Sequence, residues 1–270
     1  GIELTGKAKH AERKQHSDDA HCQPIRLFAF DQVIVYKRYQ TSRLKASDEQ
    51  GRLYWSETLT DARWSLKSDS GIRYYQVGKM GKKTLTDRND LLYNPTINPV
   101  DGSMVSIEYG VDGSSSITVI EGIGGMVLTS DKGPSGVQLI ETAWVGDDIL
   151  ATGITDEGYG IYRYSGGRWS VVLEPQPVKI KDFQTYGDEV IFTCDRTGMN
   201  ELYHLNPRTG ELRQKTVTRY GASDFAYDPE GRYLYYSSQT LKGMQIFRTA
   251  VEDLVDREAD FTQKHEWVLA

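Results

Sequence analysis

A repeating unit of short strands and tight turns dominates this sequence. The unit is clearest over residues 188–213, where the β-branched and aromatic run Glu189–Cys194 is followed by a glycine-containing turn and a second alternating run, Glu201–Leu205. Asn206–Gly210 then has the composition of a hairpin turn. Both runs are too short for helices, so the unit is predicted to be strand, turn, strand, turn, strand.

Copies of this unit occur on both sides of it. The first strand residue after each turn of the Asp-Gly type falls at positions 104, 149, 189 and 233, which are 45, 40 and 44 residues apart. That period fits one four-stranded blade of a β-propeller. A distorted copy over residues 52–85 and a partial copy over residues 25–39 bring the favoured number of blades to six, with five or seven as alternatives.

The predicted fold class is therefore an all-β propeller of four-stranded antiparallel blades. We expect an N-terminal arm or edge strand over residues 1–23 and one propeller domain over residues 24–270. The blades are expected near residues 24–47, 48–90, 91–134, 135–176, 177–218 and 219–270. Val251, Leu254 and Val255 have near-helical spacing, and Glu266–Leu269 is predicted to be a last short strand that either completes the last blade or pairs with the N-terminal segment.

Composition excludes some classes of partner. No stretch approaches 18 consecutive apolar residues, so we expect no membrane span. The net charge is −6, and no cluster of Lys and Arg is interleaved with aromatic residues. Because phosphate binding requires a basic surface, nucleic acid is not an expected partner.

The cysteines and most of the histidines give no sign of a metal or cofactor site. Cys22 and Cys194 are the only cysteines and are not in a CxxC spacing, so we expect a buried Cys194 and an incidental Cys22. A disulfide between them would require the N-terminal segment to fold back on the later blades. Polar residues near the start of the chain are too loosely spaced to predict a zinc site: His10, His16, Asp18, Asp19 and His21.

One long loop interrupts the otherwise regular repeat. Thr58–Gly71 occupies a position at which the other copies have a turn of about five residues. Loops of this length in compact domains are usually functional or disordered. The alternative is structural, with Trp64 plugging the side of its blade and Arg63 paired with Asp61. Aromatic and Arg side chains often dominate binding contacts. The candidate binding residues are Trp55, Glu57, Asp61, Arg63, Trp64, Tyr74 and Tyr75.

The blade pattern resembles a known group of propellers. Asp228–Gly231, an aromatic strand at Tyr233–Ser238 and Ile246–Arg248 are similar to the repeats of TolB-like and dipeptidyl-peptidase N-terminal propellers, a WD40-like repeat group. Tyr54–Glu57 with Asp61–Trp64 resembles a stretch of large TolB-like proteins of the bacterial envelope. The resemblance covers residues 52–252 and implies a periplasmic or extracellular location. The paired Gly-His and Trp-Asp signature of WD40 proteins proper is missing.

Three function classes remain open. Peptidases of the prolyl type carry the catalytic triad on a separate α/β domain with a G-x-S-x-G turn. This sequence has neither, since the spacing in Gly133–Gly136 is wrong, so it would be only the gating propeller of such an enzyme. A propeller glycoside hydrolase would hold two or three carboxylates over the central channel. The candidate acids are Glu57, Glu108, Glu141, Asp156, Asp182, Asp195 and Asp224.

The third class is an interaction module, which we favour. It would hold a protein, peptide or glycan on one face of the propeller. In that interpretation no catalytic residue is assigned, and no metal or cofactor is expected. Two carboxylates at the channel mouth would favour hydrolysis, whereas an aromatic face without them would favour binding.

Overall fold

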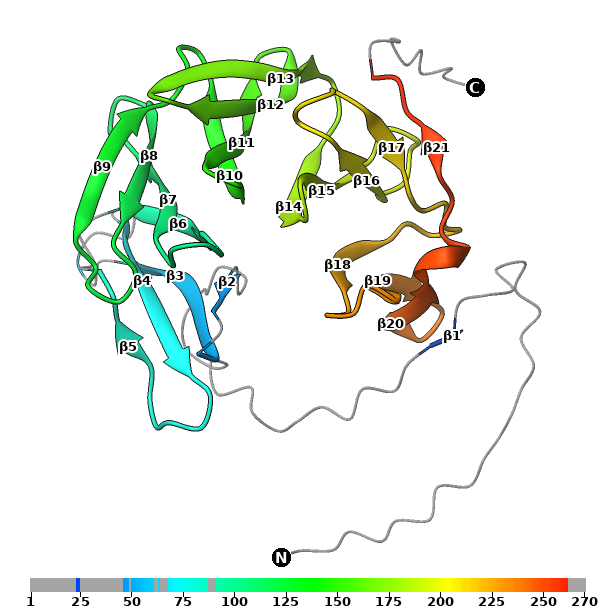
Figure 1. The fold of residues 1–270 in the computed structure, drawn as a ribbon, viewed down its shortest axis with the longest axis horizontal. Coiled ribbons are helices and arrows are strands. Elements are labelled where there is room, and N and C mark those ends of the chain that lie inside the picture. The colour runs from blue at the N-terminus through cyan, green and yellow to red at the C-terminus, as the bar shows by residue number, and fades with distance from the viewer. Residues whose placement is uncertain are drawn as a thin grey trace, which may run out of the picture.

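Five antiparallel sheets, arranged around a common centre, make up the described part of the chain (Figure 1). The computed structural model describes residues 23–24, 46–48, 50–60, 63, 68–86 and 91–261. The innermost strands are β2, β6, β10, β14 and β18, and the strands that follow each of them lie progressively farther out (Figure 1). This is the arrangement of propeller blades, so the predicted all-β propeller is confirmed.

The sheets are numbered here as blades 1 to 5 in chain order. Blade 1 comprises β2 (Ala46–Ser47), β3 (Arg52–Thr60), β4 (Ser68–Gln76) and β5 (Lys83–Thr84). Blade 2 comprises β6 (Leu92–Ile97), β7 (Met104–Tyr109), β8 (Ser115–Ile120) and β9 (Val127–Lys132). Blade 3 comprises β10 (Gln138–Val145), β11 (Asp148–Thr155), β12 (Gly158–Ser165) and β13 (Arg168–Gln176).

The last two blades each include a strand from elsewhere in the chain. Blade 4 comprises β14 (Ile180–Tyr186), β15 (Glu189–Cys194), β16 (Glu201–Leu205), β17 (Leu212–Gln214) and, as a fifth strand, β21 (Arg257–Glu258). Blade 5 comprises β18 (Ser223–Tyr227), β19 (Tyr233–Thr240), β20 (Gly243–Ala250) and, on its outer edge, β1 (Gln23–Pro24). A strand from the N-terminal segment therefore completes the last blade.

The turns form as the sequence predicts. Gly102 and Gly113 have φ angles of 74° and 81°, a region that glycine enters at little cost. In the first of these turns, the carboxylate of Asp101 accepts hydrogen bonds from both the backbone N–H and the hydroxyl of Ser103. These bonds lower the pKa of Asp101. Aspartate thus fixes the turn before the strand begins, which sets the register of the hairpin.

Hydrophobic clusters fill the spaces between successive blades. Tyr54 and Ile72 of blade 1 pack with Leu92 of blade 2. Equivalent clusters join blade 2 to blade 3, blade 3 to blade 4 and blade 4 to blade 5. Blades 1 to 4 each bury an apolar face against the next blade, so stability depends on contacts between neighbours.

After β20 the chain turns back toward blade 4. The near-helical spacing after Val251 corresponds to a single 3₁₀ turn, η1 (Val251–Asp253). Beyond it β21 pairs with β17, and Phe261 is buried in the cluster between blades 3 and 4. The strand predicted at Glu266–Leu269 lies outside the described residues.

The described residues form five blades, within the predicted range but below the favoured number of six. The partial blade expected over residues 24–47 falls almost entirely outside the described residues. Within the described ranges, no helix has the length and apolar character needed to cross a membrane.

Candidate functional site

The hairpin between β3 and β4 is longer than its counterparts. Both strands have nine residues, against six in β7 and β8 of blade 2. Their pairing continues as far as Thr60 opposite Ser68. Half of the loop predicted over Thr58–Gly71 is therefore paired strand, because the alternating pattern continues where the sequence analysis assigned a loop. Only residues 61–67 connect the two strands.

Two candidate binding residues on β3 are buried. The side chains of Trp55 and Glu57 are each only 2% exposed. The Oε2 atom of Glu57 accepts a hydrogen bond from Nε of Arg73 at 3.1 Å, and its other oxygen is paired with Lys82. Glu57 is thus part of an internal ion network. No acceptor in the described part of the chain lies within hydrogen-bonding distance of Trp55 Nε1.

The other candidates divide between the strand and the hairpin tip. Tyr74 lies on β4 and packs against Tyr54, with ring centroids 5.7 Å apart. Tyr75 is half-buried on the same strand, whereas Arg63 is exposed at the tip. Asp61 and Trp64 lie outside the described residues. The hairpin therefore presents Arg63 outward from a base formed by buried side chains.

The innermost strands line the centre of the ring and share a feature that the sequence analysis missed. Each of β6, β10, β14 and β18 contains a bulge at which the register shifts. Asn94, Asp182 and Asp224 occupy these bulges with φ angles of 51°, 56° and 55°. Asn and Asp tolerate this conformation better than other side-chain-bearing residues. The repeated Asp-Phe pairs at Asp182-Phe183 and Asp224-Phe225 were the available signal.

Side chains at these bulges bind the main chain of the next blade. Nδ2 of Asn94 donates to the carbonyl of Ile140 at 2.6 Å, from blade 2 to blade 3. The Glu141 carboxylate accepts the N–H of Phe183 at 2.8 Å, from blade 3 to blade 4. Nε2 of Gln184 donates to the carbonyl of Phe225 at 2.8 Å, from blade 4 to blade 5. The inner strands are thereby held together by polar bonds near the axis.

The candidate acids are engaged in similar ways. Asp182 accepts the hydroxyl hydrogen of Thr193 at 2.6 Å, and Asp224 accepts that of Ser237 at 2.5 Å. Farther from the axis, the Glu108 carboxylate accepts a hydrogen bond from the hydroxyl of Thr118. The Asp195 carboxylate accepts one from the backbone N–H of Lys179. Asp156 is exposed in a turn. Of the seven acids, the structure brings Glu141, Asp182 and Asp224 to the innermost strands. There they stabilise the bulges and the contacts between blades.

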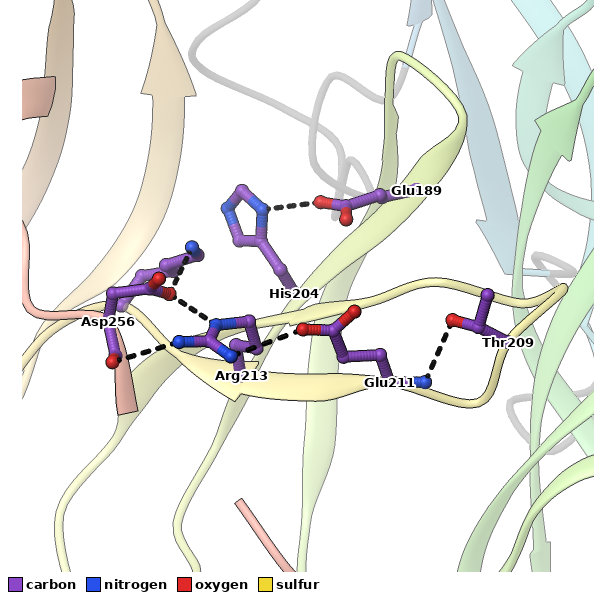
Figure 2. Close-up of polar contacts among 7 residues, drawn as sticks. Glu189, His204, Thr209, Glu211, Arg213 and Asp256 are labelled. Atoms are coloured by element: carbon purple, nitrogen blue, oxygen red, sulfur yellow. Dashed lines mark hydrogen bonds and ion pairs between the residues drawn. The ribbon is translucent and has the colours of Figure 1, made fainter. Parts of the chain in front are cut away.

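A buried histidine lies at the junction of blades 4 and 5. Nδ1 of His204 is 2.9 Å from Oε2 of Glu189, and Nε2 is 2.9 Å from the hydroxyl of Tyr227 (Figure 2 shows the contact with Glu189). Tyr186 stacks on Tyr227 with ring centroids 4.1 Å apart. Burial lowers the pKa of His204, although Glu189 opposes this effect, and burial raises the pKa of Tyr227. The neutral imidazole therefore donates to Glu189 and accepts from Tyr227.

This arrangement predicts a pH-dependent stability. A His whose pKa is lowered on folding binds fewer protons in the folded state than in the unfolded state, so stability is lost as the pH falls below about 6.5. In urea titrations between about pH 7.5 and 5.5, the wild type should lose more unfolding free energy than His204→Gln, which cannot titrate in this range. Equal slopes for the two proteins would contradict the lowered pKa.

Ion pairs hold β21 against blade 4. The carboxylate of Asp256 accepts from Nε of Arg213 at 2.5 Å and from Lys215 Nζ at 2.6 Å, and Arg213 is also paired with Glu211 (Figure 2). The hydrogen bond from Arg213 is the main cause that lowers the pKa of Asp256 to about 2. The carboxylates of Asp256 and Glu211 are more than half exposed, so these ion pairs add little stability and mainly position the strand.

The described residues were also compared with the requirements of a metal site and of a reactive thiol. Among them no three His, Cys, Asp or Glu side chains are grouped so as to hold a metal ion. Cys194 is a buried free cysteine, and burial raises its pKa to about 12, so its thiol stays protonated at neutral pH. The loosely spaced residues near the start of the chain, and Cys22, lie outside the described part.

Comparison with known proteins shows the fold. No protein-family model matches the sequence, and no curated protein matches it. Among solved structures, TolB from Acinetobacter baumannii is 15% identical over 78% of this chain and 53% of its own, with a TM-score of 0.58. A putative TolB from Agrobacterium tumefaciens is 14% identical over 82% of this chain and 81% of its own, with a TM-score of 0.60.

A puromycin-hydrolyzing peptidase of Mycobacterium tuberculosis is 11% identical over 83% of this chain and 39% of its own, with a TM-score of 0.57. The chain thus spans about half the length of the Acinetobacter TolB and less of the peptidase. At these identities the likeness concerns the fold alone. The resemblance seen in the sequence is confirmed at that level: the chain is a β-propeller similar to TolB and to the propeller domains of peptidases.

Proposed function

We propose that this chain is a non-catalytic binding module that holds a protein, peptide or glycan on one face of its propeller. The observation that supports this most directly is the β3–β4 hairpin, which is the longest departure from the repeat and presents Arg63 to solvent. Asp61 and Trp64, next to Arg63 in the sequence, complete the proposed contact. Trp and Arg are the side chains that most often anchor such contacts.

The other candidate residues form the base of the proposed site. Trp55 and Glu57 fix the base of the hairpin through packing and through the ion pair with Arg73. Tyr74 and Tyr75 lie on β4, the partner strand of the same hairpin, opposite Tyr54 and Leu53 of β3. A rigid base lowers the entropic cost of ordering the tip when a partner binds.

The state of the candidate acids supports binding rather than hydrolysis. Glu141, Asp182 and Asp224 each accept a hydrogen bond from the protein at the innermost strands. In this proposal the three carboxylates have a structural role, because their hydrogen bonds hold the bulges and the contacts between blades. By resemblance to TolB-like proteins, we place the module in a larger protein of the bacterial envelope.

Affinity capture from the native cell tests the proposed site. Wild type, Trp64→Ala and Arg63→Ala should each be shown to be folded and then used as bait. We expect a partner that wild type retains and both variants lose. Leu241→Ala, at the almost fully exposed tip of the β19–β20 hairpin, is the matched control and should retain it. Recovery of the same partner by all four baits would rule out the β3–β4 hairpin as the binding site.

A separate labelling experiment tests the absence of a serine nucleophile. The sequence lacks the G-x-S-x-G turn on which such a serine is normally held. We therefore expect a fluorophosphonate probe to give no labelling above that of the heat-denatured protein. Labelling that disappears when a single serine is replaced would show that the chain is an enzyme.

A further inference from the structure

The connection between blades 4 and 5 exposes apolar side chains and buries polar ones. It comprises residues 215–222, which lead from β17 to β18, the innermost strand of blade 5 (Figure 1). Val217 is 47% exposed and Tyr220 is 55% exposed, whereas Thr216 is buried. The two other fully described connections between blades, residues 133–137 and 177–179, are shorter and expose no large apolar side chain.

A buried carboxylate holds the first half of this connection. Glu201 of β16 is only 2% exposed. Its Oε1 atom accepts hydrogen bonds from the backbone N–H and the hydroxyl of Thr218, at 2.7 and 2.9 Å, and its Oε2 atom accepts one from the hydroxyl of Thr216 at 2.5 Å. A carboxylate is costly to bury unless it is hydrogen-bonded, so these contacts fix the connection firmly. Both threonine side chains turn inward to Glu201, and Val217 between them is left facing solvent.

The second half of the connection is fixed by neighbouring segments. The N–H of Ala222 donates to the carbonyl of Asn200 at 2.7 Å, and the hydroxyl of Ser238 donates to the carbonyl of Gly221 at 2.7 Å. The bond to Asn200 brings the connection beside Met199, which is 44% exposed in the turn between β15 and β16. The exposed apolar side chains are therefore presented on a rigid base, which lowers the entropic cost of binding.

Arg219 adds a positive charge to this surface. It is exposed, and its guanidinium carbon lies 5.2 Å from the centroid of the Tyr220 ring. It has no ionic partner in the described part of the chain. The carboxylates of the adjoining strands are engaged within the protein, Glu201 as described above and Asp224 by the hydroxyl of Ser237. A carboxylate of a binding partner is therefore the expected counter-charge for Arg219.

Met199, Val217, Arg219 and Tyr220 are named here the connection surface. We propose that the connection surface binds a peptide segment of a partner protein that carries apolar and acidic side chains. Tyr and Arg are among the side chains that contribute most to protein contacts. An anionic membrane is disfavoured as the partner, because such recognition uses clusters of about four to eight Lys and Arg. The connection surface shares no residue with the β3–β4 hairpin, so binding here is independent of the site proposed there.

Selection from a random-peptide display library tests this proposal. The library is first depleted on Tyr220→Ala and then selected on wild type, so that the retained peptides depend on Tyr220. Truncation of a ring that is more than half exposed should leave the fold intact, which a melting curve checks. We expect the retained peptides to be enriched in Asp, Glu and large apolar residues. No enrichment, or enrichment in Lys and Arg, would overturn the proposal.

A synthetic peptide with the most enriched sequence then tests the charge. Its Kd should rise at least about tenfold for Arg219→Glu, because a repulsive contact replaces an attractive one. Arg168→Glu, which reverses an exposed charge on β13, and Met80→Ala, in the exposed turn between β4 and β5, are the matched controls and should leave the Kd unchanged. Trp64→Ala should also bind the peptide normally, whether or not the hairpin is a binding site.

Three results would contradict binding of an acidic peptide at the connection surface. The first is an unchanged Kd for Arg219→Glu. The second is a wild type that sediments as a dimer while Tyr220→Ala sediments as a monomer, since the surface would then belong to a second copy. The third is binding of phosphatidylglycerol vesicles by wild type that Tyr220→Ala loses, since the surface would then contact a membrane.

Discussion

Replacement of Glu57 by alanine is expected to lower the free energy of unfolding by about 3 to 5 kcal/mol. The carboxylate is almost fully buried and is paired with Arg73 and Lys82. Its removal leaves the buried Arg73 guanidinium with only the carbonyl oxygens of Ile72 and Thr86 as partners in the described structure. An ion buried without its counter-charge is the costly product, more than the loss of the pair itself.

Two matched proteins separate this explanation from a general effect of losing a glutamate. Glu252→Ala removes an exposed carboxylate and should change stability by no more than about 0.5 kcal/mol. The double replacement Glu57→Leu with Arg73→Met removes both ions and should recover much of the loss. Chemical denaturation measures all three. A loss below about 1 kcal/mol for Glu57→Ala would mean that Glu57 is not a buried partner of Arg73.

Replacement of Phe192 by alanine should have a similarly large effect, about 3 to 5 kcal/mol. Phe192 lies on β15, is fully buried and stacks on Tyr203, with ring centroids 5.9 Å apart. It also packs against Phe183 of β14, with ring centroids 6.4 Å apart. The cavity would open in the cluster that joins blades 3 and 4, so both blades should lose stability.

Hydrogen exchange on the folded Phe192→Ala variant shows where that loss falls. Exchange should accelerate in β11 and β12 of blade 3 as well as in β15 and β16 of blade 4, because the cluster belongs to both blades. The control, Tyr220→Ala, truncates an aromatic ring that is more than half exposed and should cost less than about 1 kcal/mol. Faster exchange confined to blade 4 would contradict a core shared between blades.

Turn chemistry made the fold predictable. Asp101-Gly102 and Asp112-Gly113 have the composition that tight turns require, and the strands between such turns recur at a period that only a few folds use. These signals are local, so they can be interpreted without knowledge of the rest of the molecule. The strand β21 gave no such signal, because its two residues, Arg257 and Glu258, are charged and pair only through contacts with β17.

The candidate site was less accessible to sequence analysis, for reasons that particular residues show. Glu57 has the appearance of a functional acid in the sequence, and only the register that places Trp55 opposite Arg73 brings it to an internal ion pair. His204 sits in an alternating strand pattern with no neighbouring motif. Its partners Glu189 and Tyr227 come from strands β15 and β18, so the cluster exists only after the blades are assembled.

The affinity of the captured partner for Trp64→Ala, measured together with the melting temperature of the variant, tests the account most directly. If the β3–β4 hairpin is the binding site, truncation of Trp64 should weaken binding by more than about 1 kcal/mol, roughly fivefold or more in Kd. The melting temperature should stay within about 2 °C of the wild-type value, because a side chain that contacts a partner adds little to the free protein. An unchanged Kd with a loss of roughly 3 to 5 kcal/mol of stability would show instead that Trp64 is part of the blade core, and would contradict the proposed site.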